Sequence, residues 1–292
     1  VSKNNILVTG GAGFVGAQLI KKLAEDPNNR ISCLDNYFTG TKESHIPGVT
    51  YIEGDTNHID KLVPNGKEID IVYHFGEYSR VSTSFEDSDL VWKYNVLGTY
   101  KVLEFCRKNK CKIIYSASST KFGDSGENIF QSPYALYKAH NTNLISCYSK
   151  WFGVESVICY FYNVYGPGQI TTGKYATVIG IFERQFANKQ PLTVVSPGTQ
   201  RRSFTHIEDV VDALLLLQQT SGDGYCIGTE EEYQIIDVAK MFTNNVLYLD
   251  ERPGERKTTS IDLTKMFNLG WAPKHNLEKY IHNIKENNNE TF

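Results

Sequence analysis

The sequence predicts an α/β fold, in which a doubly wound parallel sheet is followed by a smaller α+β domain. Short apolar runs alternate with longer amphipathic stretches over about the first 160 residues, and parallel strands need crossovers of this kind. A glycine-rich turn separates the first apolar run from the first amphipathic stretch. After residue 163 the elements shorten and Gly and Pro recur. We therefore expect one domain over residues 1–163 and a second over residues 164–292.

The individual elements follow from hydrophobic periodicity. Strands are predicted at the apolar runs 6–8, 31–34, 49–52, 69–73, 112–115 and 154–160. Helices are predicted where apolar residues recur at helical spacing, at 14–25, 89–109, 133–152 and 207–219. The strands are apolar throughout because helices on both faces of a parallel sheet bury both of its sides. The helix at 207–219 lies past the expected domain boundary, and we expect it to pack back on the first domain.

Composition excludes several classes of protein. The chain has 292 residues, 22% of them charged, with a net charge of −3. This balance gives neither a nucleic-acid footprint nor a polybasic membrane signal. No apolar run reaches the ~18 residues of a membrane span, and the N-terminus lacks the pattern of a signal peptide. The six cysteines form no CxxC pair and have no accompanying histidine cluster. We therefore expect a cytoplasmic protein with reduced thiols and no metal.

The glycine-rich turn is typical of a dinucleotide site. Gly10, Gly13 and Gly16 have the spacing G-x-x-G-x-x-G, directly after a predicted strand and at the start of a predicted helix. Such glycines let backbone N–H groups approach a pyrophosphate at the positive end of a helix. Asp35 ends the second strand, 19 positions after Gly16. A carboxylate there accepts hydrogen bonds from the adenosine ribose and repels a 2′-phosphate, which predicts NAD rather than NADP. The alternative is a tight turn beside an ordinary surface aspartate.

Two further patterns suggest catalysis. Tyr134 and Lys138 are four residues apart at the start of a predicted helix, so they share one face. An ammonium near a phenol lowers the phenol's pKa and favours a general base. Tyr137 lies one step round the helix from Lys138 and is not expected to act. A run of hydroxyl residues, 116–120, ends the fifth strand, where ligands of open α/β sheets bind. The alternatives are a packed tyrosine beside a solvated lysine, and ordinary turn-forming residues.

Taken together, these and other motifs resemble the extended short-chain dehydrogenase/reductases, in the group of NAD-dependent sugar-nucleotide epimerases and dehydratases. The similarity extends over nearly the whole chain. It rests on TGGAGFVG (9–16), LDNYFTG (34–40), EGD (53–55), YNVLGT (94–99), SASSTKFGD (116–124), SPYALYK (132–138), NVYGPGQ (163–169), GTQRRSFTHIEDVVDA (198–213) and ERPGE (251–255). The resemblance implies a Rossmann-type NAD-binding domain, a nucleotide-sugar-binding domain and a homodimer that pairs the helices 89–109 and 133–152.

Carried over by position, the resemblance implies a set of cofactor-binding residues. Those at the pyrophosphate are Gly10, Gly13, Phe14 and Val15. Those at the adenosine are Asp35, Asn36, Gly40, Asp55 and Thr56. Those at the nicotinamide half are Phe75, Gly76, Glu77, Asn95, Ser116, Tyr134 and Lys138.

The resemblance also implies the catalytic and substrate-binding residues. The catalytic set is Ser118, Tyr134 and Lys138. The substrate set is Ser118, Asn163, Val178, Arg202, Arg252 and Thr259. Arg202 and Arg252 match the two arginines that hold the nucleotide diphosphate, and forked guanidinium donors suit phosphates. Thr259 is small, which predicts space for a 2-acetamido group on the sugar.

The residues after Ser118 favour one reaction within the family. The 4,6-dehydratases carry Asp-Glu there and UDP-glucuronate decarboxylases carry Glu at the second position, whereas this chain has Ser119 and Thr120. We therefore expect 4-epimerisation of a nucleoside-diphosphate hexose. The alternatives are a dehydrogenase or dehydratase-like enzyme that releases a keto sugar, and a non-catalytic NAD sensor. The segment from Gly76 to Arg80 departs from the family pattern near the sugar, so it leaves the identity of the sugar open.

Overall fold

The computed structural model describes residues 4–252, 257–258 and 260–289. Its central feature is a seven-stranded sheet with the strand order β11-β6-β5-β4-β1-β2-β3 and only parallel pairs. The strands are β1 (Asn4–Thr9), β2 (Asn29–Asp35), β3 (Thr50–Glu53), β4 (Ile71–His74), β5 (Lys112–Ser118), β6 (Ser156–Phe161) and β11 (Gly222–Ile227). All six strands predicted for the first domain are present, which confirms the α/β prediction.

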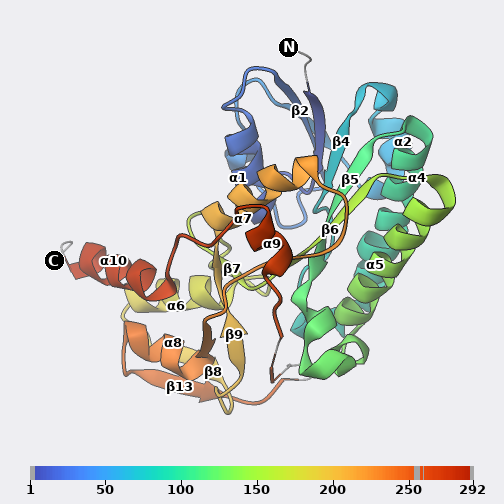
Figure 1. The fold of residues 1–292 in the computed structure, drawn as a ribbon. Helices are drawn as coiled ribbons and strands as arrows, with labels where there is room; N and C mark the ends of the chain where they lie inside the picture. Colours follow the sequence, from blue (N-terminus) through green and yellow to red (C-terminus); the bar gives the residue numbers. More distant parts are fainter. Residues whose placement is uncertain (1–3, 253–256, 259, 290–292) are drawn as a thin grey trace.

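Helices cover both faces of this sheet (Figure 1). On one face lie α1 (Phe14–Leu23) and α7 (Ile207–Leu216). The other face carries α2 (Ile59–Leu62), α3 (Ser88–Val91), α4 (Thr99–Asn109) and α5 (Pro133–Phe152). The centre of the sheet is buried, and this includes all seven residues of β5. This is the double-sided burial that continuously apolar strands predict.

The helix predicted at 89–109 is present in three parts. A π-helical stretch, Trp92–Gly98, joins α3 to α4. Within it the backbone carbonyl of Asn95 accepts a hydrogen bond from Asn141 Nδ2 at 2.8 Å. The wider turn therefore supplies a carbonyl oxygen to α5, and such local widening often occurs near functional sites.

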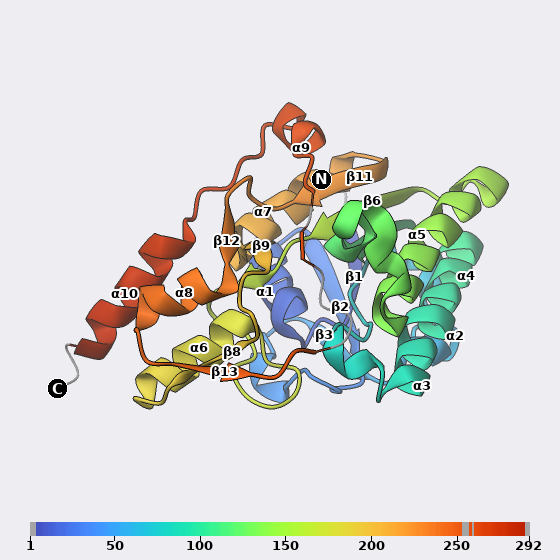
Figure 2. The same cartoon turned by 90° about the horizontal axis from the view of Figure 1, so that it is seen from below.

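A second, smaller core lies beside the main sheet (Figure 2). It is built from α6 (Val178–Ala187), α8 (Ile235–Phe242), α10 (Leu277–Asn289) and the parallel pair β8 (Leu192–Val195) and β13 (Val246–Leu249). Between the two cores lie two short pairs, β7 (Val164–Tyr165) with β10 (Thr205–His206) and β9 (Arg201–Ser203) with β12 (Glu232–Gln234). The short helix α9 (Thr264–Asn268) packs on β11.

The two cores do not divide the chain at a single residue. Helix α7 packs against α1, as we expected for residues 207–219. Strand β11, which was not predicted, pairs with β6 and adds a seventh strand to the main sheet. Met266 and Trp271 are also buried in the main core. The domain boundary between residues 163 and 164 therefore stays a prediction, because segments on both sides of it contribute to the main core.

Two observations bear on the chemical environment of the chain. In the part of the chain that the structure describes, no helix is both long and apolar enough to cross a bilayer. All six cysteines are free, and five of them are buried. The thiols therefore pack as small apolar side chains, as their spacing predicts.

His74 links the main sheet to α4. The ring ends β4 and is fully buried. Its Nδ1 lies 2.7 Å from Thr9 Oγ1 and its Nε2 lies 2.9 Å from Thr99 Oγ1. Burial, opposed by the charge of Glu77, lowers the pKa of His74 to about 4. The ring is therefore neutral in the folded protein at physiological pH.

We expect His74 to make the free energy of unfolding decrease as the pH is lowered. The pKa of an unfolded histidine is about 6.5, so between pH 6.5 and 4 the unfolded state binds a proton that the folded state excludes. The free energy of unfolding should therefore drop by about 3 kcal/mol across this window through His74 alone. Carboxylates titrate there too, so the measurement is the difference between wild type and His74→Gln in urea unfolding at several pH values. Parallel pH profiles for the two proteins would contradict the assignment.

Candidate active site

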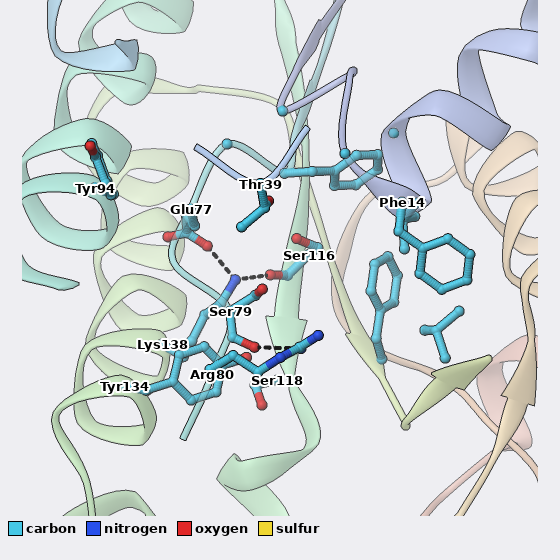
Figure 3. Close-up of a pocket in the computed structure, with 18 of the residues that line it drawn as sticks. Phe14, Thr39, Glu77, Ser79, Arg80, Tyr94, Ser116, Ser118, Tyr134 and Lys138 are labelled. Atoms are coloured by element: carbon cyan, nitrogen blue, oxygen red, sulfur yellow. Dashed lines mark hydrogen bonds and ion pairs between the residues drawn. The ribbon is translucent and has the colours of Figure 1, made fainter. Parts of the chain in front are cut away.

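A large cavity lies at the carboxyl ends of the central strands. Its volume is about 430 Å³, and Figure 3 shows part of its wall. It extends from the glycine-rich turn, past the ends of β4 and β5, to the start of α5 and to β9. Open α/β sheets bind their ligands at this edge. Sixteen of the predicted site residues line it, namely Gly10, Gly13, Phe14, Val15, Asp35, Asn36, Thr56, Phe75, Gly76, Glu77, Ser116, Ser118, Tyr134, Lys138, Asn163 and Arg202.

The glycine-rich turn has no room for a side chain at Gly10 or Gly16. Gly10 has φ +70°, and a Cβ there would lie 2.7 Å from the backbone nitrogen of Gly76. A Cβ on Gly16 would lie 2.3 Å from the carbonyl oxygen of Gly10. Helix α1 begins directly after Gly13, so its free N–H groups face the same turn. This close-packed turn at a helix N-terminus is the cradle that a dinucleotide pyrophosphate fits.

Asp35 holds the glycine-rich turn in place. Its carboxylate accepts hydrogen bonds from the backbone N–H groups of Ala12, at 2.8 Å, and Tyr37, at 2.7 Å. Burial raises the pKa of Asp35, and these N–H groups oppose the change. A carboxylate has about four acceptor positions, so the side chain still has acceptors for ribose hydroxyls on the cavity side. The residues present therefore fit NAD.

Three predicted cofactor residues lie outside the cavity wall. Asp55 accepts hydrogen bonds from Asn36 Nδ2 at 2.6 Å and pairs with Lys93 at 2.7 Å. Burial raises the pKa of Asp55, but these two partners outweigh it and leave the value lowered. Gly40 lies against the turn, since a Cβ there would be 2.7 Å from the carbonyl carbon of Ala12. Asn95 is fully buried. In the described structure these three residues position the wall rather than form it.

The reacting end of the cavity contains the predicted catalytic set. Ser118 ends β5, and its Oγ accepts hydrogen bonds from the backbone N–H and the hydroxyl of Thr120, at 3.2 and 3.0 Å. Helix α5 begins at Pro133 and is capped by Ser132, whose Oγ accepts from Ala135 N. This sharp start aims the first turn of α5 at the cavity.

The two tyrosines of α5 have different surroundings. Tyr134 points to the same part of the cavity as Ser118 (Figure 3). Tyr137 instead packs edge-on against Trp92, with ring centroids 5.6 Å apart. It does not line the cavity. The structure therefore brings Ser118, Tyr134 and Lys138 together and leaves Tyr137 out, as the helical spacing predicts.

Lys138 forms a buried ion pair with Glu77. The exposed fractions of the two side chains are 6% and 2%. The ammonium of Lys138 donates to Glu77 Oε2 and, at 2.6 Å, to the backbone carbonyl of Ser116. The same ammonium lies over the ring of Tyr115, 4.9 Å from its centroid. Glu77 therefore supplies the counter-charge of the lysine and holds its position.

The carboxylate of Glu77 is surrounded by donors. Its Oε1 accepts hydrogen bonds from the hydroxyl of Thr99 at 2.7 Å, Asn141 Nδ2 at 2.8 Å and the hydroxyl of Tyr115 at 3.1 Å. These residues come from α4, α5 and β5. A buried carboxylate is tolerated only when it is paired and hydrogen-bonded in this way. The network therefore satisfies the acceptor positions of the Glu77 carboxylate.

The same network reaches back to the glycine-rich turn. Thr99 gives its proton to Glu77, so its oxygen accepts from Nε2–H of His74. Nδ1 of His74 then accepts from the hydroxyl of Thr9, whose oxygen accepts in turn from the backbone N–H of Gly76 at 3.1 Å. A directed chain of hydrogen bonds thus links the cofactor turn to the ion pair.

Some of the predicted substrate-binding residues line the cavity, and others lie outside its wall. Asn163 and Arg202 line the cavity, and Arg202 is buried while Arg201 is exposed. Alternation along β9 explains this difference, since successive side chains of a strand point to opposite sides. Val178 begins α6 without lining the cavity, although its neighbour Thr177 does line it. Arg252 is exposed and outside the wall. Thr259 lies outside the described residues.

Several wall residues were not predicted. They include Phe38, Thr39, Ser79, Arg80, Val81, Tyr94, Asn128, Ile170 and Thr177. Arg80 is the charged residue among them. In the sequence, the segment from Gly76 to Arg80 departs from the family pattern. This departure did not indicate where the side chain of Arg80 lies. Its contact with Tyr175, described below, spans 95 residues, and periodicity carries no information at that distance.

A cluster away from the cavity contains potential metal ligands. Atoms of His206, Glu208 and His275 lie within 4.8 Å of one another. However, Nδ1 of His206 accepts a hydrogen bond from the backbone N–H of Glu208 at 3.3 Å. A neutral His206 therefore carries its proton on Nε2. His275 contacts both Glu208 and Asp209. We interpret His206 as the N-terminal cap of α7 and His275 as a structural contact to the first turn of that helix.

We expect the Glu77–Lys138 pair to be a major determinant of stability. Glu77→Gln keeps the shape of the side chain but leaves a buried ammonium without its counter-charge, which should cost about 3–5 kcal/mol. The double variant Glu77→Gln/Lys138→Met should recover a large part of that loss, because no uncompensated charge remains. Urea unfolding measures both.

Glu25→Gln is the matched control, since Glu25 pairs with Lys22 on the exposed surface and exposed pairs add little. Equal losses in the single and double Glu77 variants would show that the pair is not coupled.

Comparisons with known proteins agree with this geometry. The profile of the NAD dependent epimerase/dehydratase family matches residues 6–228. A Methanocaldococcus jannaschii protein named "Putative UDP-glucose 4-epimerase" is 31% identical, and the match covers 98% of this chain and 100% of that protein. The crystal structure of the Thermus thermophilus UDP-glucose 4-epimerase in complex with NAD matches with a TM-score of 0.88 and 25% identity, over 99% of this chain and 100% of that chain.

Relatives with other reactions match as well. UDP-glucuronic acid decarboxylase 5 of Arabidopsis thaliana is 29% identical over 98% of this chain and 89% of its own length, and dTDP-D-glucose 4,6-dehydratases also match. Similar solved structures hold NAD, so the cofactor is NAD, as Asp35 predicts. The chain belongs to the NAD-dependent epimerase/dehydratase family, whose members act on sugar nucleotides.

Proposed function

We propose that this protein is an NAD-dependent 4-epimerase of a nucleoside-diphosphate hexose that works through a transient 4-keto sugar. The observation that carries the proposal is the chemistry of the reacting end. It presents the hydroxyls of Ser118, Ser119 and Thr120, the phenol of Tyr134 and the ammonium of Lys138. Elimination of water from C5 and C6 of the sugar needs an acid/base beyond this set.

The carboxylates of the cavity do not meet that need. Among the described wall residues they are Asp35 and Glu77. Asp35 is bound to the glycine-rich turn. Glu77 is occupied by Lys138, Thr99, Tyr115 and Asn141. Oxidation and reduction at one carbon need only a hydroxyl-binding group and one proton carrier, which favours epimerisation over dehydration.

In the proposed mechanism each residue has a separate task. Bound NAD would accept a hydride equivalent from C4 of the sugar and later return it. Ser118 holds the oxygen on C4 by a hydrogen bond, and Tyr134, as the phenolate, removes the hydroxyl proton and afterwards returns it. Lys138 lines the same part of the cavity, and its positive charge stabilises the negative phenolate. Asn163 and Arg202 lie further along the wall and hold the nucleotide part.

Epimerisation places one further demand on the cavity. The keto sugar must present its opposite face before reduction, so the sugar must be held loosely while the nucleotide is held firmly. The buried position of Arg202 on β9 suits the firm grip. Relatives that act on UDP-sugars support a UDP-hexose as the first substrate class to test, and N-acetylhexosamines form the second class because Thr259 is small.

The proposal predicts the product and its dependence on Tyr134. Incubation with a panel of UDP-, dTDP-, GDP- and CDP-hexoses should convert one of them to its 4-epimer without release of NADH, as ¹H NMR and absorbance at 340 nm would show. Tyr134→Phe should reduce the rate by ~10²–10⁴-fold, since only the proton carrier is lost. It should retain the bound NAD, which chromatography of the extracted nucleotide checks.

Stoichiometric NADH together with a released keto sugar would instead identify a dehydrogenase-like enzyme. A Tyr134→Phe variant at near wild-type rate would contradict the assigned proton carrier.

We further propose a homodimer formed through the outer surface of α3, α4 and α5. This surface exposes the large apolar side chains Trp92, Leu97, Tyr100, Leu136 and Trp151, and a monomer rarely leaves such a set uncovered. Leu103 and Tyr148 lie on the same helices but are buried within the subunit, and Tyr94 lines the cavity.

Light scattering should give about twice the 33.1 kDa of one chain at micromolar concentration. Tyr100→Glu should shift the protein toward the monomer, because it places a charge on the apolar surface. Leu216→Glu changes an exposed apolar residue elsewhere and serves as the control. A wild-type monomer would reject the proposal.

A further inference from the structure

Arg80 places a guanidinium in the wall at the reacting end of the cavity. Figure 3 shows its side chain beside Ser118 and Tyr134, where Ser79 and Val81 also line the wall. Burial lowers the pKa of Arg80, and the nearby Tyr134 and Tyr78 oxygens oppose this change. An arginine keeps its charge in proteins all the same, so the wall is positive at this point.

The segment that carries Arg80 is firmly held. The backbone N–H and carbonyl of Tyr78 bond to both ends of the Asn95 amide, at 2.7 and 3.0 Å. Nε of Arg80 donates to the carbonyl oxygen of Tyr175 at 2.8 Å, and Nη2 donates to the same oxygen. Nη1 donates to the carbonyl oxygen of Ser79 at 3.0 Å. The guanidinium is therefore fixed before any ligand arrives.

Backbone carbonyls do not neutralise this charge. In the described parts of the chain no carboxylate forms an ion pair with Arg80. The nearby Asp87 is already bound to Lys174, Tyr78 and Tyr175. Three of the five guanidinium N–H groups have donated, so one remains on each terminal nitrogen. Two N–H groups in one plane match the two oxygens of a carboxylate.

Sugar geometry tells which part of a substrate would meet Arg80. Under the proposed function Ser118 and Tyr134 hold the oxygen on C4. In a pyranose ring C3 and C5 adjoin C4, whereas C1, which bears the diphosphate, lies across the ring. A guanidinium beside Ser118 and Tyr134 therefore faces substituents on C3 or C5 rather than the diphosphate, which Arg202 on β9 is placed to hold.

We propose that Arg80 forms a carboxylate subsite, so that the preferred substrates are nucleoside-diphosphate sugars with a carboxylate next to the reacting carbon. This inference rests on the proposed function for the orientation of the sugar. Two sources supply the same chemistry, a hexuronate with the acid on C5 and a sugar with an acidic ether on C3. The C5 acid is the shorter reach, since its carboxylate is attached directly to the ring.

The test measures binding rather than turnover, so that a failure of epimerisation does not affect it. Calorimetry on the NAD-loaded Tyr134→Phe protein compares UDP-glucuronic acid, UDP-N-acetylmuramic acid and UDP-glucose. We expect UDP-glucuronic acid to bind about 10- to 100-fold more tightly than UDP-glucose, the range that a charge-assisted bidentate contact supplies. Arg80→Gln should abolish this preference, and Arg80→Lys should keep only part of it because the fork is lost.

Lys174→Gln is the matched control. It removes a positive charge that pairs with Asp87 on the surface and lies outside the cavity wall, so the preference should stay within about twofold of the parent value. Tighter binding of UDP-N-acetylmuramic acid than of UDP-glucuronic acid would assign the acid to C3 and still support the subsite. Equal affinities for the acidic and neutral sugars would overturn it. So would Arg80→Gln weakening both equally, because this would mean that Arg80 holds the nucleotide.

Discussion

The buried ion pair between Glu77 and Lys138 is the constraint on which the active site depends. Both side chains are almost fully enclosed, and neither charge is tolerated there without the other. Glu77 follows β4, Lys138 lies on α5, and the remaining donors to the carboxylate come from α4, β5 and α5. The carboxylate therefore fixes the relative positions of four elements, and it fixes the ammonium that the reaction needs.

This pairing also changes the electrostatics of the reacting end. The opposite charges of Glu77 and Lys138 largely cancel at a distance, so the charge of Lys138 acts only on its immediate neighbours. Arg80 then supplies the uncompensated positive charge beside Tyr134. That charge attracts an anionic substrate. This attraction acts at Arg80 only if the acidic group of the substrate lies near the carbon that reacts.

Local patterns explain which features were predictable from the sequence. The six strands, the glycine-rich turn, Asp35 and the face shared by Tyr134 and Lys138 all depend on spacings of a few residues, and the structure contains them. Strand β11 was missed because it joins β6 only after an excursion of about sixty residues through the second core. The surroundings of Glu77 and Arg80 were missed for the same reason, since their partners are 61 and 95 residues away. Asp55 and Asn95 come from matched motifs, and their hydrogen bonds to Asn36 and Tyr78 join residues too far apart for local patterns to predict.

The two ends of the cavity are built in different ways, and this bears on how specificity arises. The cofactor end consists of a turn and strand ends that belong to one rigid sheet. The sugar end depends on contacts between the segment after β4 and the loop before α6, where Arg80 and Asp87 both bond to Tyr175. Loops on a rigid scaffold tolerate substitution better than the scaffold does. Changes in these two segments can therefore alter the sugar that is accepted while the NAD site and the Glu77–Lys138 pair stay unchanged.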